Sequence, residues 1–182
     1  MIKTLLMCFV LIIGLSACST ASKNKNYDSK KSNINEAYTI LYEITSKQKD
    51  LDKISVLKDI SPAVNPLLKD ISKASEKLAK TLDNWTKQNE IQNNLKSLPA
   101  FEKQTRKEIE FNTTKKILVS SGNSLEKLLL LKQNEALNYQ SHLCQWISQN
   151  EKNNYRQQTL QDFKKRFEKL NQRAFDLLSL NQ

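Results

Sequence analysis

The sequence predicts an all-α fold, an up-and-down bundle of four or five long helices that follows a flexible tether. Glycine and proline are scarce, with 2 and 3 residues among 182, so the chain has little of the turn chemistry that β-hairpins need. In each long segment the apolar residues recur at steps of three and four, which is the period of an amphipathic helix. We expect the bundle to span residues 33–182.

Residues 1–17 are predicted to be a signal peptide. Lys3 gives a basic start, and residues 5–15 form an apolar run. This run is shorter than the roughly 20 residues that a helix needs to cross a bilayer, and it has the layout of a secretory signal. Its ending, Leu15-Ser16-Ala17-Cys18, closely resembles the lipobox of a bacterial lipoprotein.

The resemblance implies cleavage before Cys18 and attachment of acyl chains such as palmitate to that cysteine, which is the predicted lipidation site. At about 0.8 kcal/mol per buried CH₂, more than one chain makes residence in a membrane stable. Ser19 rather than an aspartate follows the cysteine. By resemblance to lipoproteins of two-membrane bacteria, this points to the periplasmic face of the outer membrane. For the domain that follows, the resemblance implies nothing.

Residues 18–32 are predicted to be the lipidated cysteine and a flexible, basic tether. They contain little besides Ser, Thr, Asn and Lys and lack apolar periodicity. Such a segment reaches on the order of 20 Å, enough to hold a domain just off a membrane. Near anionic headgroups its lysines would add about 1 kcal/mol each.

Three segments are predicted to be amphipathic helices, each of which buries one stripe of apolar residues. In the first segment, Gln48 takes one core position. The last segment follows the polar run 150–154, a short connection that predicts an antiparallel return. The three stripes are Ile34, Ala37, Leu41, Ile44 and Leu51; Leu67, Ile71, Ala74, Leu78, Leu82 and Trp85; and Leu160, Phe163, Phe167, Leu170, Ala174 and Leu177.

The remaining boundaries follow from proline and glycine. Ser61-Pro62 and Asn65-Pro66 each offer a capping side chain before a proline, which a first helical turn tolerates, and they separate the first two helices. Pro99 starts a third helix. Two outcomes are open for it: it continues to about Gln149, or it breaks within residues 120–123.

Residues 125–147 are predicted to form the central, largely buried helix. Their apolar residues cover well over half of the helix circumference, which is typical of a helix with several neighbours. Cys144 lies among them and is expected to be a buried, inert thiol. The apolar set is Leu125, Leu128, Leu129, Leu130, Leu131, Ala136, Leu137, Leu143, Cys144, Trp146 and Ile147.

Polar residues interrupt this helix and form the one candidate site. Glu135, Asn138 and His142 line one flank, whereas Gln133 and Gln140 share another. The functional interpretation is a ligand-binding or metal-binding cleft on the first three. The favoured alternative is an internal hydrogen-bond network or a partly exposed flank. Any buried member should be hydrogen-bonded, since an unpaired buried polar group costs about 1–3 kcal/mol.

We expect no metal, no cofactor and no enzymatic activity. Glu135 and His142 lie two turns apart, about 10.5 Å along a helix, so they cannot bind one ion side by side. A single histidine excludes the Glu-x-x-His pairs of di-iron bundles. The sequence shows no nucleophile elbow, phosphate-binding glycine loop or paired-cysteine zinc pattern.

The formal net charge of +10 suggests anionic partners. The predicted export would separate the protein from nucleic acid, so the candidate partners are the membrane, envelope proteins and anionic surfaces. The favoured interpretation is that the dispersed lysines only keep the protein soluble. The leading hypothesis is a non-enzymatic, membrane-anchored interaction or structural module of the envelope. The alternative is a binding protein for a small apolar or amphipathic ligand, and an envelope hydrolase is favoured least. The sequence does not indicate an oligomeric state.

Overall fold

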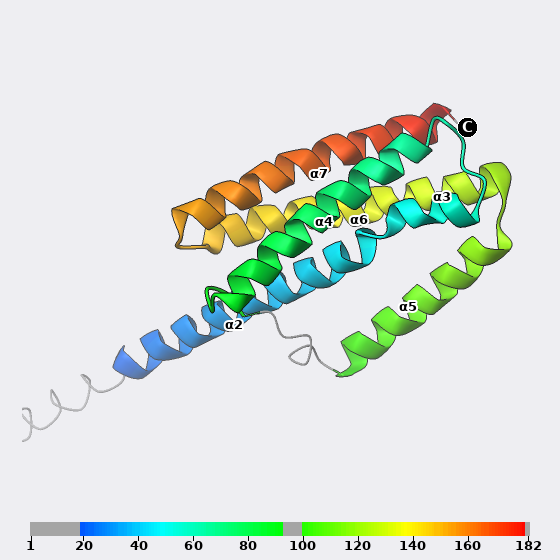
Figure 1. Ribbon diagram of the computed structural model, residues 1–182. Coiled ribbons are helices and arrows are strands. Elements are labelled where there is room, and N and C mark those ends of the chain that lie inside the picture. The colour runs from blue at the N-terminus through cyan, green and yellow to red at the C-terminus, as the bar shows by residue number, and fades with distance from the viewer. Residues whose placement is uncertain (1–18, 93–99, 181–182) are drawn as a thin grey trace, which may run out of the picture. The chain divides into compact units, whose positions relative to one another are not determined.

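The computed structural model describes residues 19–92 and 100–180, and every secondary-structure element in these ranges is a helix (Figure 1). This confirms the predicted all-α fold. The chain divides into two units, residues 1–34 and residues 35–182, and the packing below is that of the second. The elements are α2 (Ser19–Gln48), the 3-10 turn η2 (Leu51–Lys53), α3 (Ile54–Leu57), α4 (Asn65–Lys87), α5 (Ala100–Val119), α6 (Gly122–Asn150) and α7 (Asn154–Leu180).

Helix α2 runs antiparallel to both α4 and α6. In the second half of α2 the Tyr38 ring lies edge-on to the Trp85 ring of α4, with 6.3 Å between the ring centroids. Ten residues later Gln48 accepts a 3.2 Å hydrogen bond from Ser75 of α4. Gln48 also donates a 2.8 Å hydrogen bond to Gln133 of α6. Gln48 is buried, as the first stripe predicts.

Helix α7 completes the four-helix core by running antiparallel to α6 and α4. The side-chain amides of Asn134 and Asn171 each donate to the backbone carbonyl of the other residue, which joins the middle of α6 to α7. Arg173 of α7 forms a 2.7 Å ion pair with Asp70 of α4. The antiparallel return predicted for the last helix is confirmed.

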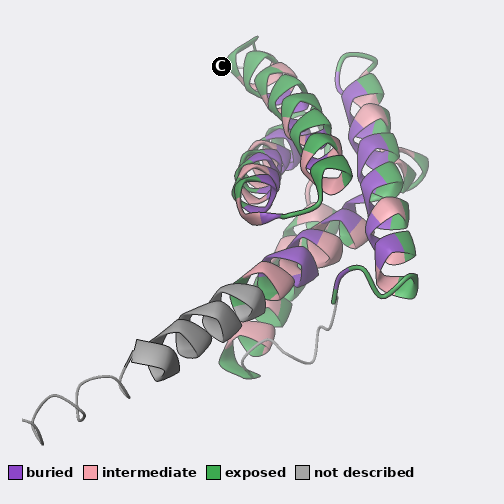
Figure 2. Cartoon of the chain, turned by 90° about the vertical axis from the view of Figure 1, so that its left-hand side faces the viewer, coloured by how far each residue is buried: buried purple, intermediate pink, exposed green. Residues whose placement is uncertain are grey.

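Buried residues form stripes along the core helices, as Figure 2 shows. All six predicted positions of α4 are buried, and so are those of α7 except the half-buried Leu177. In the first stripe Ile34 and Ile44 are half-buried and the other positions are buried. Each buried leucine contributes roughly 1.5–3 kcal/mol, so these stripes account for most of the driving force for folding.

The start of the chain differs from the predicted tether, because α2 begins at Ser19 rather than near residue 33. Residues 19–32 contain no proline or glycine, and their lysines are good helix formers. Extending an existing helix fixes one residue per hydrogen bond, whereas nucleation fixes several. A segment that continues a packed helix can therefore be helical at a low cost.

The structure settles two helix boundaries. The helix that begins after Pro99 breaks within residues 120–123 instead of continuing to about Gln149, because α5 ends at Val119 and α6 begins at Gly122. Gly122 adopts a φ of +54°, a conformation that favours glycine. The capping prediction for Asn65 is wrong: Val64 is the N-cap, and the Asn65 Oδ1 has no partner among the described residues. Pro66 does lie in the first turn.

Helix α6 is less completely buried than predicted. Leu125, Leu129 and Cys144 are buried, but Leu131 and Trp146 are exposed. The apolar residues of α6 extend around more of the helix than the other core helices cover. Helix α5 does not cover the remainder, since it buries none of its own side chains. No helix in the described ranges combines the length and the apolar character needed to span a bilayer.

Candidate functional site

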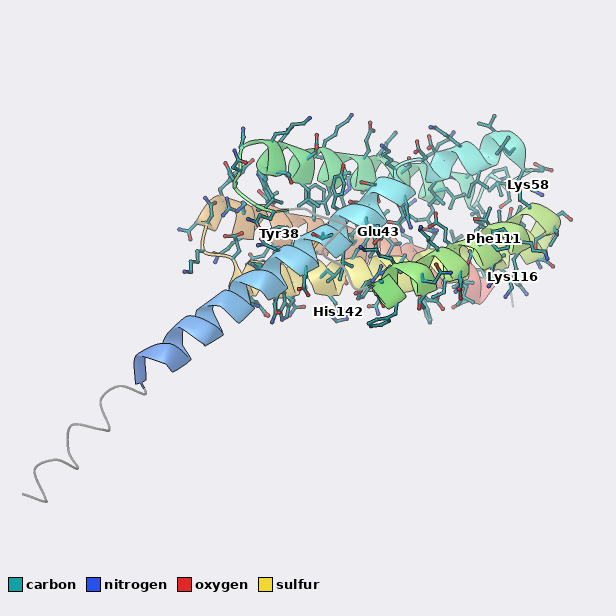
Figure 3. The ribbon with its side chains drawn as sticks, turned by 90° about the horizontal axis from the view of Figure 1, so that it is seen from below. Tyr38, Glu43, Lys58, Phe111, Lys116 and His142 are labelled. Carbon is teal, nitrogen blue, oxygen red and sulfur yellow. The ribbon has the colours of Figure 1, made fainter. Side chains whose placement is uncertain are left out.

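The predicted polar flank of α6 is exposed to solvent. Glu135, Asn138 and His142 all lie on the surface, and Glu135 forms a 2.7 Å ion pair with Lys132. Figure 3 shows His142 at the outer side of the helix. The three residues do not enclose a cleft within the described part of the chain, which agrees with an exposed flank. Cys18, the predicted lipidation site, and the signal peptide lie outside the described residues.

The other predicted polar flank is buried, and its two residues behave differently. Gln133 accepts the hydrogen bond from Gln48 and so belongs to the layer with Ser75. Gln140 is fully buried, and neither its amide oxygen nor its amide nitrogen has a partner among the described residues. The expectation that every buried member is hydrogen-bonded holds for Gln133 and is wrong for Gln140.

The densest polar cluster is one that the sequence did not indicate. Glu151, in the turn between α6 and α7, accepts a 2.6 Å hydrogen bond from the hydroxyl of Tyr38. Arg156 donates to both carboxylate oxygens, at 3.0 and 2.9 Å, and also bonds Glu90 at 2.9 Å. The backbone N–H groups of Lys152 and Asn153 complete the set of donors.

The electrostatics of this cluster follow from burial and hydrogen bonding. Burial favours the neutral form of Glu151, but the hydrogen bonds from Arg156, Tyr38 and the two backbone N–H groups outweigh it and lower the pKa of Glu151 to about 2. Burial, together with the bond to Glu151, raises the pKa of the Tyr38 hydroxyl far above its usual value. Both carboxylate oxygens are fully engaged, so the cluster holds the turn in place rather than exchanging protons.

Helix α5 carries the most unusual surface of the molecule. It spans 20 residues and buries none of them. Five of its large apolar side chains are exposed: Phe101, Ile109, Phe111, Leu118 and Val119 are 73%, 59%, 70%, 62% and 77% exposed. Ile109 lies nearly half a turn from Phe111 around the helix, and we call the other four residues the α5 outer face. Exposed apolar surface on a monomeric protein marks an interaction site when its residues lie together, and Phe111, Leu118 and Val119 fall within the last three turns of α5.

Spacing along the helix explains why these four residues share one side. Phe111 and Leu118 lie about two turns apart, and Phe101 and Val119 lie five turns apart at about 3.6 residues per turn, so each pair is aligned along the helix. The two pairs lie about a quarter of a turn from each other, which places all four residues on one half of the helix surface. The opposite side of α5 is turned toward the bundle. Its half-buried residues include Glu102, Arg106, Thr113 and Ile117.

Polar contacts hold α5 against the rest of the domain. Lys47 of α2 pairs with Glu110 at 2.6 Å, and Glu43 lies 3.7 Å from Arg106. At the other end, the ammonium group of Lys58 donates to the backbone carbonyls of Leu118 and Ser120, at 2.6 and 3.2 Å. A cation at a helix C-terminus also interacts favourably with the helix dipole. This side of α5 is therefore attached mainly by charge.

No pattern in the sequence predicts this exposed surface, because apolar residues in a helix are expected to face a neighbouring helix. Within the described ranges, no group of three or more His, Cys, Asp and Glu side chains is placed to hold a metal ion. Comparison with protein-family models, with curated proteins and with solved structures finds no match to this chain.

Proposed function

We propose that this protein is a lipoprotein of the bacterial envelope whose helical domain acts as a non-enzymatic interaction module. Acyl chains on Cys18 hold the chain at a membrane, on the periplasmic face of the outer membrane. The observation that carries the proposal is the ending Leu15-Ser16-Ala17-Cys18 after a basic and apolar leader. The structure supports the second half of the proposal with an exposed surface, the α5 outer face.

The roles of the two notable regions differ. The Glu151 cluster is buried and saturated with donors, so it stabilises the fold. The α5 outer face contributes nothing to the core and offers apolar side chains to a partner. An interaction module needs such a surface on a scaffold that is stable without it.

Lipidation is tested in cells with single cysteine variants. Cys18→Ala should release the domain from the membrane fraction, and the intact mass should lose the acyl chains. Cys8→Ala is the matched control, because this cysteine lies in the leader but outside the lipobox. The parent chain should begin at residue 18 and carry acyl chains. A parent chain that begins at Met1 without lipid contradicts the proposal.

One observation favours a second candidate, a binding protein for a small amphipathic ligand. The amide of Gln140 is buried and has no hydrogen-bond partner in the described part of the chain, and a ligand with a polar group would satisfy it. Native mass spectrometry of the purified protein tests this. A copurified small molecule that is lost in Gln140→Met supports ligand binding, whereas an unliganded mass in the parent protein argues against it.

A further inference from the structure

Helix α5 has three carboxylates, and cations pair with two of them. Glu110 pairs with Lys47 at 2.6 Å, and Glu102 pairs with Arg106 at 2.8 Å. The third, Glu108, is exposed and accepts a hydrogen bond from Gln104.

Cations remain on the exposed surface, where Lys107, Lys115 and Lys116 all lie in solvent. Glu108 lies among them, three positions from Phe111, so three lysines against one carboxylate leave the surface around the α5 outer face with a net positive charge.

The lysines lie directly beside the apolar residues. Lys107 and Lys115 are each four positions from Phe111, so they are its neighbours on the helix surface. Figure 3 shows Phe111 and Lys116 on the same helix. Exposed aromatic and aliphatic side chains with lysines beside them offer both the apolar contact and the positive charge by which a protein surface attaches to an anionic bilayer.

A third group of side chains lies at the C-terminal end of α5. Val56 and Leu57 of α3 are 82% and 79% exposed. They immediately precede Lys58, whose ammonium group holds the carbonyls of Leu118 and Ser120. Apolar residues of α3 and α5 therefore lie at the same end of the domain.

From this arrangement we infer that the α5 outer face docks on an anionic lipid bilayer. Phe101, Phe111, Leu118 and Val119 enter the boundary between headgroups and acyl chains, while Lys107, Lys115 and Lys116 contact lipid phosphates. Charge complementarity selects the bilayer over an apolar protein groove, because a positively charged surface attracts anionic headgroups without a shaped partner.

The inference rests on the proposed function in one respect, since the anchor at Cys18 would hold the domain at a lipid surface. A tether makes the second contact intramolecular, so a weak affinity for the bilayer suffices. The contact itself needs no acyl chain, which allows the two ideas to be tested apart.

The experiment uses the mature chain from residue 18 carrying Cys18→Ala, so that neither leader nor acyl chain contributes. Binding is measured by cosedimentation with vesicles of phosphatidylcholine alone and of phosphatidylcholine mixed with phosphatidylglycerol. We expect binding to the anionic vesicles only. The paired variants Phe111→Asp/Leu118→Asp and Lys107→Glu/Lys115→Glu should each lower the partition coefficient by roughly tenfold or more.

Matched controls on α7 change exposed residues of the same kind. Phe175→Asp alters one exposed aromatic residue, and Lys165→Glu/Lys169→Glu reverses two exposed lysines. These variants should bind as the parent chain does, and circular dichroism should show equal helix content in all of them. Equal losses in the α7 and α5 variants overturn the inference, because binding would then depend on net charge alone.

Other occupants give different results. If the parent chain cosediments with neither kind of vesicle, the inference is overturned, and a protein partner becomes the candidate for this surface. A dimer in analytical ultracentrifugation that Phe111→Asp/Leu118→Asp dissociates overturns it in favour of a second copy. Loss of anchoring in cells with Cys18→Ala is a separate result. It bears on the proposed function and not on the vesicle measurement.

Discussion

The hydroxyl of Tyr38 donates a 2.6 Å hydrogen bond to Oε2 of Glu151, a residue 113 positions later in the chain. Tyr38 is on α2, and Glu151 belongs to the turn that joins α6 to α7. This hydrogen bond therefore joins the first helix of the core to the turn between its last two helices. Arg156 and the Trp85 ring extend the same cluster to the end of α4, since Arg156 bonds Glu90 and Trp85 lies against Tyr155.

Glu151→Gln should lower the free energy of unfolding by about 2–3 kcal/mol, because it leaves the largely buried Arg156 without its bidentate partner. Urea denaturation followed by circular dichroism measures the change. Glu168→Gln is the control, since Glu168 forms an exposed pair with Lys164 and should change stability by less than about 0.5 kcal/mol. Equal effects of the two variants would show that the Glu151 cluster is not a stabilising unit.

The same carboxylate predicts a specific dependence of stability on pH. The pKa of Glu151 is about 2 in the folded chain against an ordinary value of 4.5. Its contribution is complete above the ordinary value and is lost as the pH falls toward the folded value. The difference in unfolding free energy between the parent and Glu151→Gln should therefore shrink between about pH 5 and pH 2. A difference that stays constant across this window would contradict the assignment.

Gln140→Met should stabilise the domain by about 1 kcal/mol, because it removes a buried amide without partners and keeps the side-chain volume. Gln133→Met is the matched control on the same helix. It should destabilise the domain, since it breaks the bond with Gln48 and leaves a buried amide unpaired. Thermal unfolding of the two variants measures both effects, and a destabilised Gln140→Met would show that the Gln140 amide is satisfied in solution.

Backbone amides of α5 should exchange hydrogen at least about hundredfold faster than those of α6, because α5 buries no side chain. Native-state hydrogen exchange with mass spectrometry measures the two helices separately. Lys47→Met should accelerate exchange in α5 further by removing the pair with Glu110. Lys80→Met is the control, since Lys80 pairs only with Glu76 of its own helix among the contacts described, and it should leave α5 unchanged.

Cys144 should be unreactive toward thiol reagents in the folded protein. Its side chain is fully buried, and burial raises the pKa of the thiol far above its usual value, so little thiolate forms at neutral pH. In the mature chain with Cys18→Ala, a maleimide should label Cys144 only after denaturation. Rapid labelling under native conditions would show that α6 opens locally.

The predictions that rest on local periodicity agree best with the structure. The α4 stripe from Leu67 to Trp85 is buried throughout, and Gln48 occupies the core position that its spacing indicates. Such patterns are set by the helical period and by the presence of any neighbour. They do not say which neighbour covers which sector, which is why Leu131 and Trp146 were predicted to be buried and are exposed.

The features that sequence reasoning missed depend on contacts between distant segments. Nothing near Glu151 indicates that Tyr38 will reach it, since the two residues belong to different elements. The exposure of Phe111 likewise depends on α5 being held by Lys47 and Lys58 with its apolar side outward. Gly122 was recognised as an ambiguous position, and only its left-handed backbone settles that the chain turns there.

Tyr38 and Gln48 contact their partners at two positions of α2 that are ten residues apart. The domain is therefore sensitive to a change in the number of residues between them. One residue inserted between them would rotate one partner by about 100° relative to the other and shift it by about 1.5 Å. Either the bond to Glu151 or the bond to Gln133 would then be lost. An insertion or deletion in this interval therefore disrupts one of the two contacts, whereas a substitution there preserves the alignment of the helices.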